Sequence, residues 1–153
     1  MIHLYVCGPM LVKSLGVSLY YVTFIDDFSR KTPMYLLKTK YGVFGKFQEF
    51  KVEVENLTDK KIKMLRFDNG GEYISKELVS FCKATKIRRE LIVPHNPQQN
   101  GVAERKNRSI EEFVKAMMNG HNLSMFLWGE ETMTTIFVQN SSPHHILKNM
   151  TPK

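Results

Sequence analysis

The spacing of the apolar side chains changes near residue 40, and this change limits the folds that the chain can adopt. Segment 2–7 alternates as a strand does, 17–25 is rich in β-branched and aromatic residues, and 32–38 follows a turn as its partner strand. From Val43 the apolar residues recur at the 3.6-residue spacing of a helix. The sequence therefore predicts an antiparallel meander of strands followed by a helix at 43–57.

The same spacing predicts which side chains point inward. Pro33 lacks an N–H, so we place the strand at 32–38 at the edge of the sheet. In the last predicted helix, Met133 and Phe137 share one face, and Leu127, Thr134 and Val138 share another. The core residues that we expect in the other elements are Ile2, Leu4, Val6, Val43, Phe44, Phe47, Phe50, Val54, Leu78, Val79 and Cys82.

Strand and helix patterns alternate along the rest of the chain. We predict strands at 61–67 and 89–93 and helices at 76–86, 101–118 and 125–140. A loop at 94–100 precedes the second of these helices and ends in Asn100, its candidate N-cap. This order predicts an α/β fold, a mixed sheet flanked by helices, with one domain at 1–140 and a loose tail at 141–153.

The balance of charge bears on the partners of the chain. Its 153 residues include 22 Lys and Arg against 15 Asp and Glu, a net charge of +7. Such an excess is typical of a protein that binds nucleic acid, and also of a plain basic surface. The basic residues form three clusters in the sequence, at 60–63, 86–89 and 105–108.

The sequence also bears on the location of the protein. No apolar run reaches the about 18 residues that a membrane span needs. Cys7 and Cys82 form no CxxC pair, so we expect a reduced, intracellular protein.

Two carboxylates stand where an active site can form. Asp68 directly follows a predicted strand, where α/β sheets place their sites, although the DNGG at 68–71 also suits a tight turn. Glu104 lies in the first turns of a predicted helix, where it either holds a cation or complements the helix dipole. Asn107 and Arg108 follow on the same helical face, where they either touch phosphates or form a solvated surface. Local sequence leaves both interpretations open.

The order of two motifs resembles a known family. "LRFDNGGEY" and then "VPHNPQQNGVAERKNRSIEEF" place Asp68 and Glu104 with 35 residues between them. Together with "YYVTFIDDFSRKTPMYLLKTK" and "LWGEETMTTIFVQNSSP", they resemble the catalytic core of integrases from copia-type (Pseudoviridae) LTR retrotransposons, and more broadly retroviral integrases. The likeness covers nearly the whole chain.

The resemblance implies an RNase H-like fold with a five-stranded mixed sheet. It also implies a triad of two Asp and one Glu that holds two Mg²⁺ or Mn²⁺ ions for 3′-end processing and strand transfer, a two-metal transesterification. By position, Asp68 is the second acid and metal ligand, and Glu104 is the third. The loop at 94–100 would be the mobile active-site loop.

The resemblance implies partners as well. The DNA-binding residues would be Arg105, Lys106, Asn107 and Arg108, and the DNA would be retroelement ends and target DNA. The family also implies a homo-oligomer and a nuclear location, and no membrane.

The first acid of the family's triad is missing at the position where the family pattern has it. The family pattern resembles His-x-Asp-x-Cys-Gly-Pro-Met, and this sequence has HLYVCGPM at 3–10, with Tyr5 at the acid position. A tyrosine hydroxyl has a pKa near 10, so it is neutral at pH 7 and adds no charge to hold a metal. Its ring is also larger than an Asp side chain. We therefore expect weakened binding of Mg²⁺ or Mn²⁺ and impaired catalysis.

Neighbouring residues offer little replacement. Asp26 and Asp27 lie at the far end of the adjacent strand, and Glu72 belongs to the turn after Asp68. His3 and Cys7 suggest zinc, but without further ligands at suitable spacing we assign them to the strand face.

The function that we expect is that of a retroelement integrase core in a catalytically impaired copy. The alternatives are a catalytically dead RNase H-like DNA-binding module and a decayed transposon fragment. Because the chain starts within its first strand, we also expect it to be truncated at the N-terminus, either as a fragment of a Pol polyprotein or through a mispredicted start.

Overall fold

A five-stranded sheet forms the centre of the fold, in the order β3-β2-β1-β4-β5. The computed structural model describes residues 1–67, 75–92, 97–148 and 150–152. β1 is antiparallel to β2 and parallel to β4, so the predicted mixed sheet is confirmed, and β3 holds the edge position that Pro33 predicted. The strands are β1 (Ile2–Cys7), β2 (Tyr20–Asp26), β3 (Met34–Leu37), β4 (Met64–Phe67) and β5 (Arg88–Leu91).

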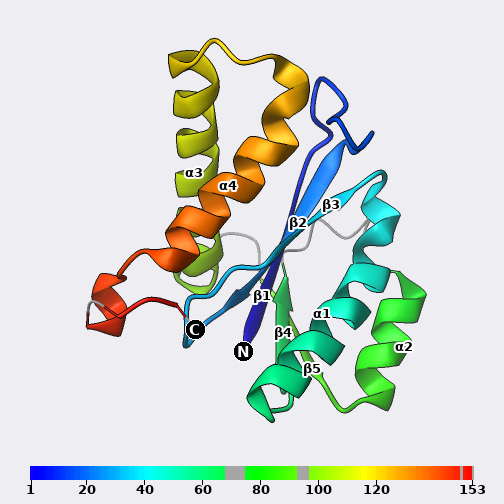
Figure 1. The fold of residues 1–153 in the computed structure, drawn as a ribbon. Helices are drawn as coiled ribbons and strands as arrows, with labels where there is room; N and C mark the ends of the chain where they lie inside the picture. Colours follow the sequence, from blue (N-terminus) through cyan, green and yellow to red (C-terminus); the bar gives the residue numbers. More distant parts are fainter. Residues whose placement is uncertain (68–74, 93–96, 149, 153) are drawn as a thin grey trace.

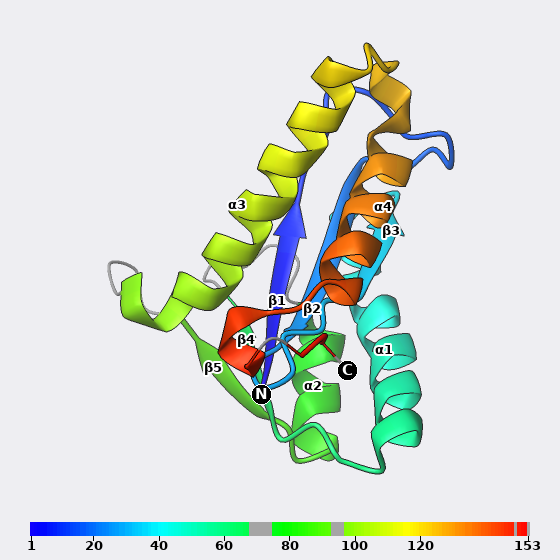
Figure 2. The same ribbon diagram turned by 60° about the vertical axis from the view of Figure 1, so that its left-hand side comes forward.

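Helices cover both faces of this sheet (Figures 1 and 2). One face carries α1 (Val43–Thr58) and α2 (Lys76–Ala84), and the other carries α3 (Pro97–Gly120) and α4 (Trp128–Ser141). The described helices include none that is both long enough and apolar enough to span a bilayer. The short 3₁₀ helices are η1 (Lys40–Gly42), η2 (Met125–Leu127) and η3 (His145–Leu147).

The face under α1 and α2 holds the apolar core. Ile2 and Leu4 of β1 point into it, as their alternation predicted, and Val6 packs at its margin. Phe24 of β2 stacks on Phe50 of α1 with ring centroids 4.7 Å apart. The other predicted core residues that lie in or against this cluster are Val43, Phe44, Phe47, Val54, Leu78 and Cys82.

The face under α3 and α4 buries polar side chains. His3, Thr23 and Asn107 are each at most 1% exposed. On β1 the His-Tyr-Cys side is therefore covered by helix rather than open to solvent. A polar layer of this kind needs hydrogen-bond partners, because an unpaired buried polar group is costly.

Neither of the two faces noted for the last predicted helix is the inward face of α4. Met133 and Phe137 are 53% and 71% exposed, whereas Thr132 and Ile136 are buried. The reason is a close approach at Gly129, where an added Cβ would lie 3.2 Å from side-chain atoms of both Leu36 and Ser14. Small and hydroxyl side chains therefore form the contact, and spacing of apolar residues alone could not identify it.

Several element boundaries also differ from the prediction. β2 starts at Tyr20 rather than Val17, because Val17 has a left-handed φ of 61° that an extended strand excludes. α3 starts at Pro97, so the loop predicted at 94–100 is wrong for its second half, and Asn100 lies inside the helix. Proline is well suited to a first helical position because its missing N–H would have no partner there. The tail predicted at 141–153 stays a prediction; its residues include a bridge between His144 and Met150.

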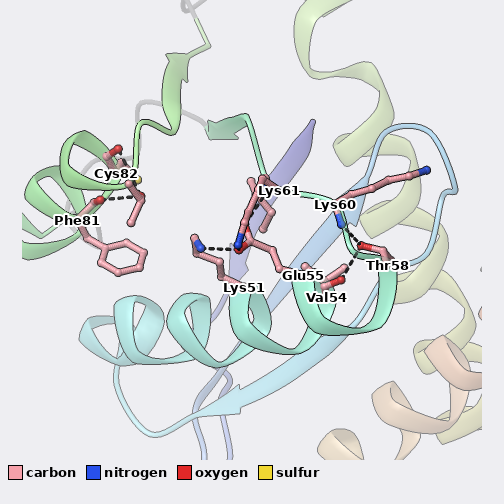
Figure 3. Close-up of polar contacts among 10 residues, drawn as sticks. Lys51, Val54, Glu55, Thr58, Lys60, Lys61, Phe81 and Cys82 are labelled. Carbon is pink, nitrogen blue, oxygen red and sulfur yellow. Dashed lines mark hydrogen bonds and ion pairs between the residues drawn. The ribbon is translucent and has the colours of Figure 1, made fainter.

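A buried carboxylate joins the end of α1 to the start of β4 (Figure 3). Glu55 accepts hydrogen bonds from Lys51 Nζ at 2.7 Å, from Lys61 Nζ at 3.2 Å and from the backbone N–H of Ile62 at 2.9 Å. These bonds hold 60–63 in a non-strand path, and β4 therefore begins at Met64 rather than at Lys61. Burial raises the pKa of Glu55, but the hydrogen bonds outweigh burial and hold the pKa below its ordinary value.

We expect Glu55→Gln to lower the free energy of unfolding at pH 7 by about 1–2 kcal/mol, because the bonds to Lys51 and Lys61 lose their charge. A carboxyl group with a lowered folded-state pKa stabilises the fold above its ordinary pKa, and this contribution disappears as the pH falls. The difference between the two proteins should therefore shrink below about pH 4.5. Urea unfolding from pH 7 to pH 3 measures it.

Glu49→Gln is the matched control, because it makes the same change on the same helix in an exposed pair with Lys46. An equal loss in both variants, or a Glu55→Gln difference that is independent of pH, would contradict the role given to Glu55.

Candidate active site

Tyr5 occupies the middle of β1 on the side covered by α3. It lies opposite Thr23 of β2 and is half-buried. The preceding residue, Leu4, pairs with Phe67, the last residue of β4. Asp68 and Glu72 lie outside the described residues. Tyr5, at the position where the family pattern has its first acid, is thus in the central strand, beside the end of β4.

Two side-chain contacts fix α3 against this part of the sheet. Thr23 Oγ1 donates to Asn107 Oδ1 at 3.1 Å, and Asn107 Nδ2 donates to the carbonyl of Ala103 at 2.8 Å. One turn further along α3, Cys7 Sγ donates to Glu111 Oε1 at 3.6 Å. Because Thr23 lies opposite Tyr5 and Asn107 lies one turn after Glu104, the Glu104 turn is held beside the Tyr5 position.

The predicted DNA-binding residues separate into two groups. Arg105 and Arg108 are exposed, as is Glu104, whereas Lys106 is half-buried. Burial lowers the pKa of Lys106 to about 8. Asn107 differs from the expectation, because its side chain is 1% exposed and both its polar groups are bonded within the protein. Its observed contacts are those of a residue that positions α3.

The acids at the end of β2 lie away from Tyr5. Asp26 is opposite Ile2, three residues along β2 from Thr23, which corresponds to about 10 Å. Its carboxylate accepts from the backbone N–H of Ser29 at 2.8 Å. Asp27 Oδ1 is 3.2 Å from His3 Nε2 and 3.4 Å from Arg30 Nη1. Both acids therefore serve the turn after β2.

His3 and Cys7 have protein partners on the α3 side. Burial lowers the pKa of His3, against the opposing effect of its bond to Asp27. Burial raises the pKa of Cys7 to about 11, so the group beside Glu111 is a neutral thiol at pH 7. Within the part of the chain that the structure describes, no three His, Cys, Asp or Glu residues come together as a metal site.

The described residues do not match the donor set of a two-metal centre. Divalent ions such as Mg²⁺ require several oxygen ligands, mostly carboxylates. At the first acid position the chain has a neutral phenol, Tyr5, and of the matched acids the structure describes Glu104 alone. No catalytic step through metal ions follows from this arrangement.

The sequence did not reveal the partners that hold α3. Tyr21, Thr23 and Ile25 lie at alternate positions of β2, so they share a face. This pattern does not indicate that Thr23 donates a hydrogen bond to Asn107, 84 residues further along the chain. It also does not indicate that the Cys7 thiol donates to Glu111.

We expect Thr23→Val to lower the free energy of unfolding by about 1–3 kcal/mol, because it leaves Asn107 Oδ1 buried without a donor. Thr23→Ser keeps the hydroxyl and should retain most of this stability. Denaturant unfolding of both variants checks the expectation. A serine variant that is less stable than the valine variant would contradict the importance of the hydrogen bond.

Comparison with known sequences identifies the family. The sequence profile described as "Integrase core domain" matches residues 7–97. The retrovirus-related Pol polyprotein from transposon TNT 1-94 of Nicotiana tabacum is 51% identical over 138 residues, which are 90% of this chain and 10% of that protein. The corresponding polyprotein from transposon RE2 of Arabidopsis thaliana is 33% identical over 133 residues, 87% of this chain and 9% of that protein. The chain thus spans about a tenth of the length of these relatives.

Solved structures agree on the fold. A chain of the simian T-cell lymphotropic virus intasome in complex with PP2A regulatory subunit B56 gamma matches with a TM-score of 0.65 at 19% identity, covering 91% of this chain and 47% of that one. The HTLV-2 integrase catalytic core domain in complex with magnesium matches with a TM-score of 0.60 at 18% identity, covering 92% and 84%. The fold is therefore RNase H-like, as the resemblance implied. From the matched profile and the similarity to the TNT 1-94 polyprotein, the chain belongs to the integrase core domains of copia-type retrotransposon Pol polyproteins.

Proposed function

We propose that this chain is an integrase core that binds DNA but is impaired in 3′-end processing and strand transfer. The observation that carries the proposal is Tyr5, a neutral side chain in the middle of β1 where the family pattern has an acid. The core of the fold is intact around it, since Leu4 and Phe67 on either side of the β1–β4 pair are buried.

The loss of one carboxylate has a direct electrostatic consequence. Two divalent ions held close together need several negative ligands to offset their mutual repulsion, and Asp68 and Glu104 would supply only two. A phenol with a pKa near 10 supplies none at neutral pH. We infer that Mg²⁺ or Mn²⁺ binds weakly at these two acids, and that the remaining acids near β2 are too far along the sheet to compensate.

The exposed bases of α3 support the DNA-binding part of the proposal. Arg105 and Arg108 follow Glu104 on α3, and both are exposed and available to phosphates. Lys106 would gain from the same contact, because a neighbouring phosphate favours its charged form. From the family, we further propose that retroelement ends and target DNA are the partners, that copies of the chain associate, and that the protein acts in the nucleus; the structure that shares the fold is part of an intasome.

A catalytically silent DNA-binding module is the second candidate function, and the neutral side chain of Tyr5 favours it as well. The two candidates differ in whether the rest of the site is still able to work once an acid is restored. A decayed fragment is the third, and the continuous core from β1 to α2 argues against it.

The test is Tyr5→Asp in this chain, assayed with Mn²⁺ on a blunt-ended DNA duplex for processing and on a duplex with a recessed 3′ end for strand transfer. We expect the natural chain to give no processing or strand transfer, and Tyr5→Asp to give measurable product. The restored carboxylate should also raise the melting temperature in Mn²⁺, because an ion that binds only the folded state stabilises it. This second readout does not depend on catalysis.

Tyr5→Phe is the matched control, since it also removes the hydroxyl but adds no charge, and it should remain inactive. Glu104→Gln added to Tyr5→Asp should abolish the recovered activity and the Mn²⁺ shift. Activity in the natural chain would overturn the proposed impairment. A Tyr5→Asp variant that binds Mn²⁺ but yields no product would favour the silent module.

A further inference from the structure

A second concentration of positive charge lies at the end of the sheet where β4 and β5 begin. Residues 59–63 and 83–89 carry seven Lys or Arg and one Asp, a net charge of +6 against +7 for the whole chain. We call the six exposed bases nearest the strands the basic end. They are Lys60, Lys61, Lys63, Lys86, Arg88 and Arg89.

The tertiary structure brings two separate clusters of basic residues, at 60–63 and 86–89, together in this surface. The backbone N–H of Arg88 donates to the carbonyl of Lys63 at 2.9 Å, and Arg88 is in register with Met64 at the start of β4. Residues more than 20 positions apart in sequence therefore come together at one end of the sheet. Figure 1 shows that α1 and α2 both end near this point, so no further element of the described fold covers it.

The scaffold beneath the basic end is well anchored. Glu55 bonds Lys51, Lys61 and the Ile62 N–H, and Figure 3 shows the Lys60 side chain extending away from this cluster. Ile87 is 4% exposed, and its backbone N–H donates to the carbonyl of Cys82 at 2.8 Å. Because the backbone is fixed, a ligand would order only the outer side chains, which lowers the entropic cost of binding.

The basic end is separate from the candidate active site. Lys63 precedes β4 and the Tyr5 position lies beside the far end of that strand, which is about 13 Å away along four residues. Bases at helix C-termini also offset the helix dipole. That effect applies to Lys83 in the last turn of α2, but it does not account for the rest of the charge here. α1 has no base in its last turn, Lys63 directly precedes β4, and Arg88 and Arg89 belong to β5.

We infer that the basic end is a second nucleic-acid-binding surface, distinct from the α3 face, that contacts the phosphate backbone without reading bases. A cluster of exposed cations on a fixed backbone attracts a polyanion, and each neutralised phosphate releases a counterion. The inference goes beyond the proposed function, since it assigns a contact remote from the site of chemistry. Phosphodiester backbones are common to DNA and RNA, and the experiment includes both.

The test compares Lys63→Gln/Arg88→Gln with the control Lys13→Gln/Lys38→Gln, which removes the same charge from exposed lysines elsewhere. Binding of a labelled DNA duplex and of a single-stranded RNA is measured by anisotropy between about 50 and 200 mM salt. For the basic-end variant we expect about tenfold weaker binding at low salt and a salt-dependence slope that is smaller by about two for duplex DNA. The control should keep the slope, and melting temperatures confirm that both variants fold.

A third variant, Arg105→Gln/Arg108→Gln, separates this inference from the proposed function. If it weakens binding further when combined with the basic-end variant, the two surfaces act together. An effect on RNA alone supports the surface and assigns its partner to RNA. If the basic-end variant and the lysine control are indistinguishable on both nucleic acids, the inference is overturned, whatever the α3 variant does. If only the α3 variant is without effect, the DNA contact proposed for α3 fails and the basic end stands.

Discussion

The hydrogen bond between Thr23 and Asn107 is the contact on which the candidate site depends. It lies in a polar layer between the sheet and α3, where His3 is also buried. If either Thr23 or Asn107 lost its partner there, a buried polar group would be left without a hydrogen bond, which destabilises the fold. Apolar helices can adjust by small shifts, but a buried pair of polar atoms is satisfied at one position. α3 is therefore held at a defined height along β1, and Glu104 with it.

The two sides of β1 explain how the residue at position 5 can change while the fold persists. Ile2 and Leu4 face the apolar core under α1 and α2, and nothing about the change at Tyr5 disturbs that side. Tyr5 lies on the opposite side, where it alters charge rather than packing of the main core. The residues that form the site and the residues that form the core are different, so a substitution at position 5 leaves the family's fold in place.

Regular apolar spacing predicted the elements that pack through apolar side chains. The α1 face of Phe47 and Phe50 and the edge position of β3 were correct for this reason. The same spacing did not identify the contact of α4, which is made by Gly129 and threonines, or the burial of Asn107. In these places small or polar residues determine the packing, and their partners lie far away in the sequence.

The sequence by itself determined the net charge, the family motifs and the absence of an acid at Tyr5, because these depend only on which residue stands at each position. Only the tertiary structure decided which residues meet. It joined the bases of 60–63 to those of 86–89, kept 105–108 apart on α3, and paired Thr23 with Asn107. The physical reason is that such contacts depend on strand register and helix packing, which are settled by the whole fold at once rather than by any local segment.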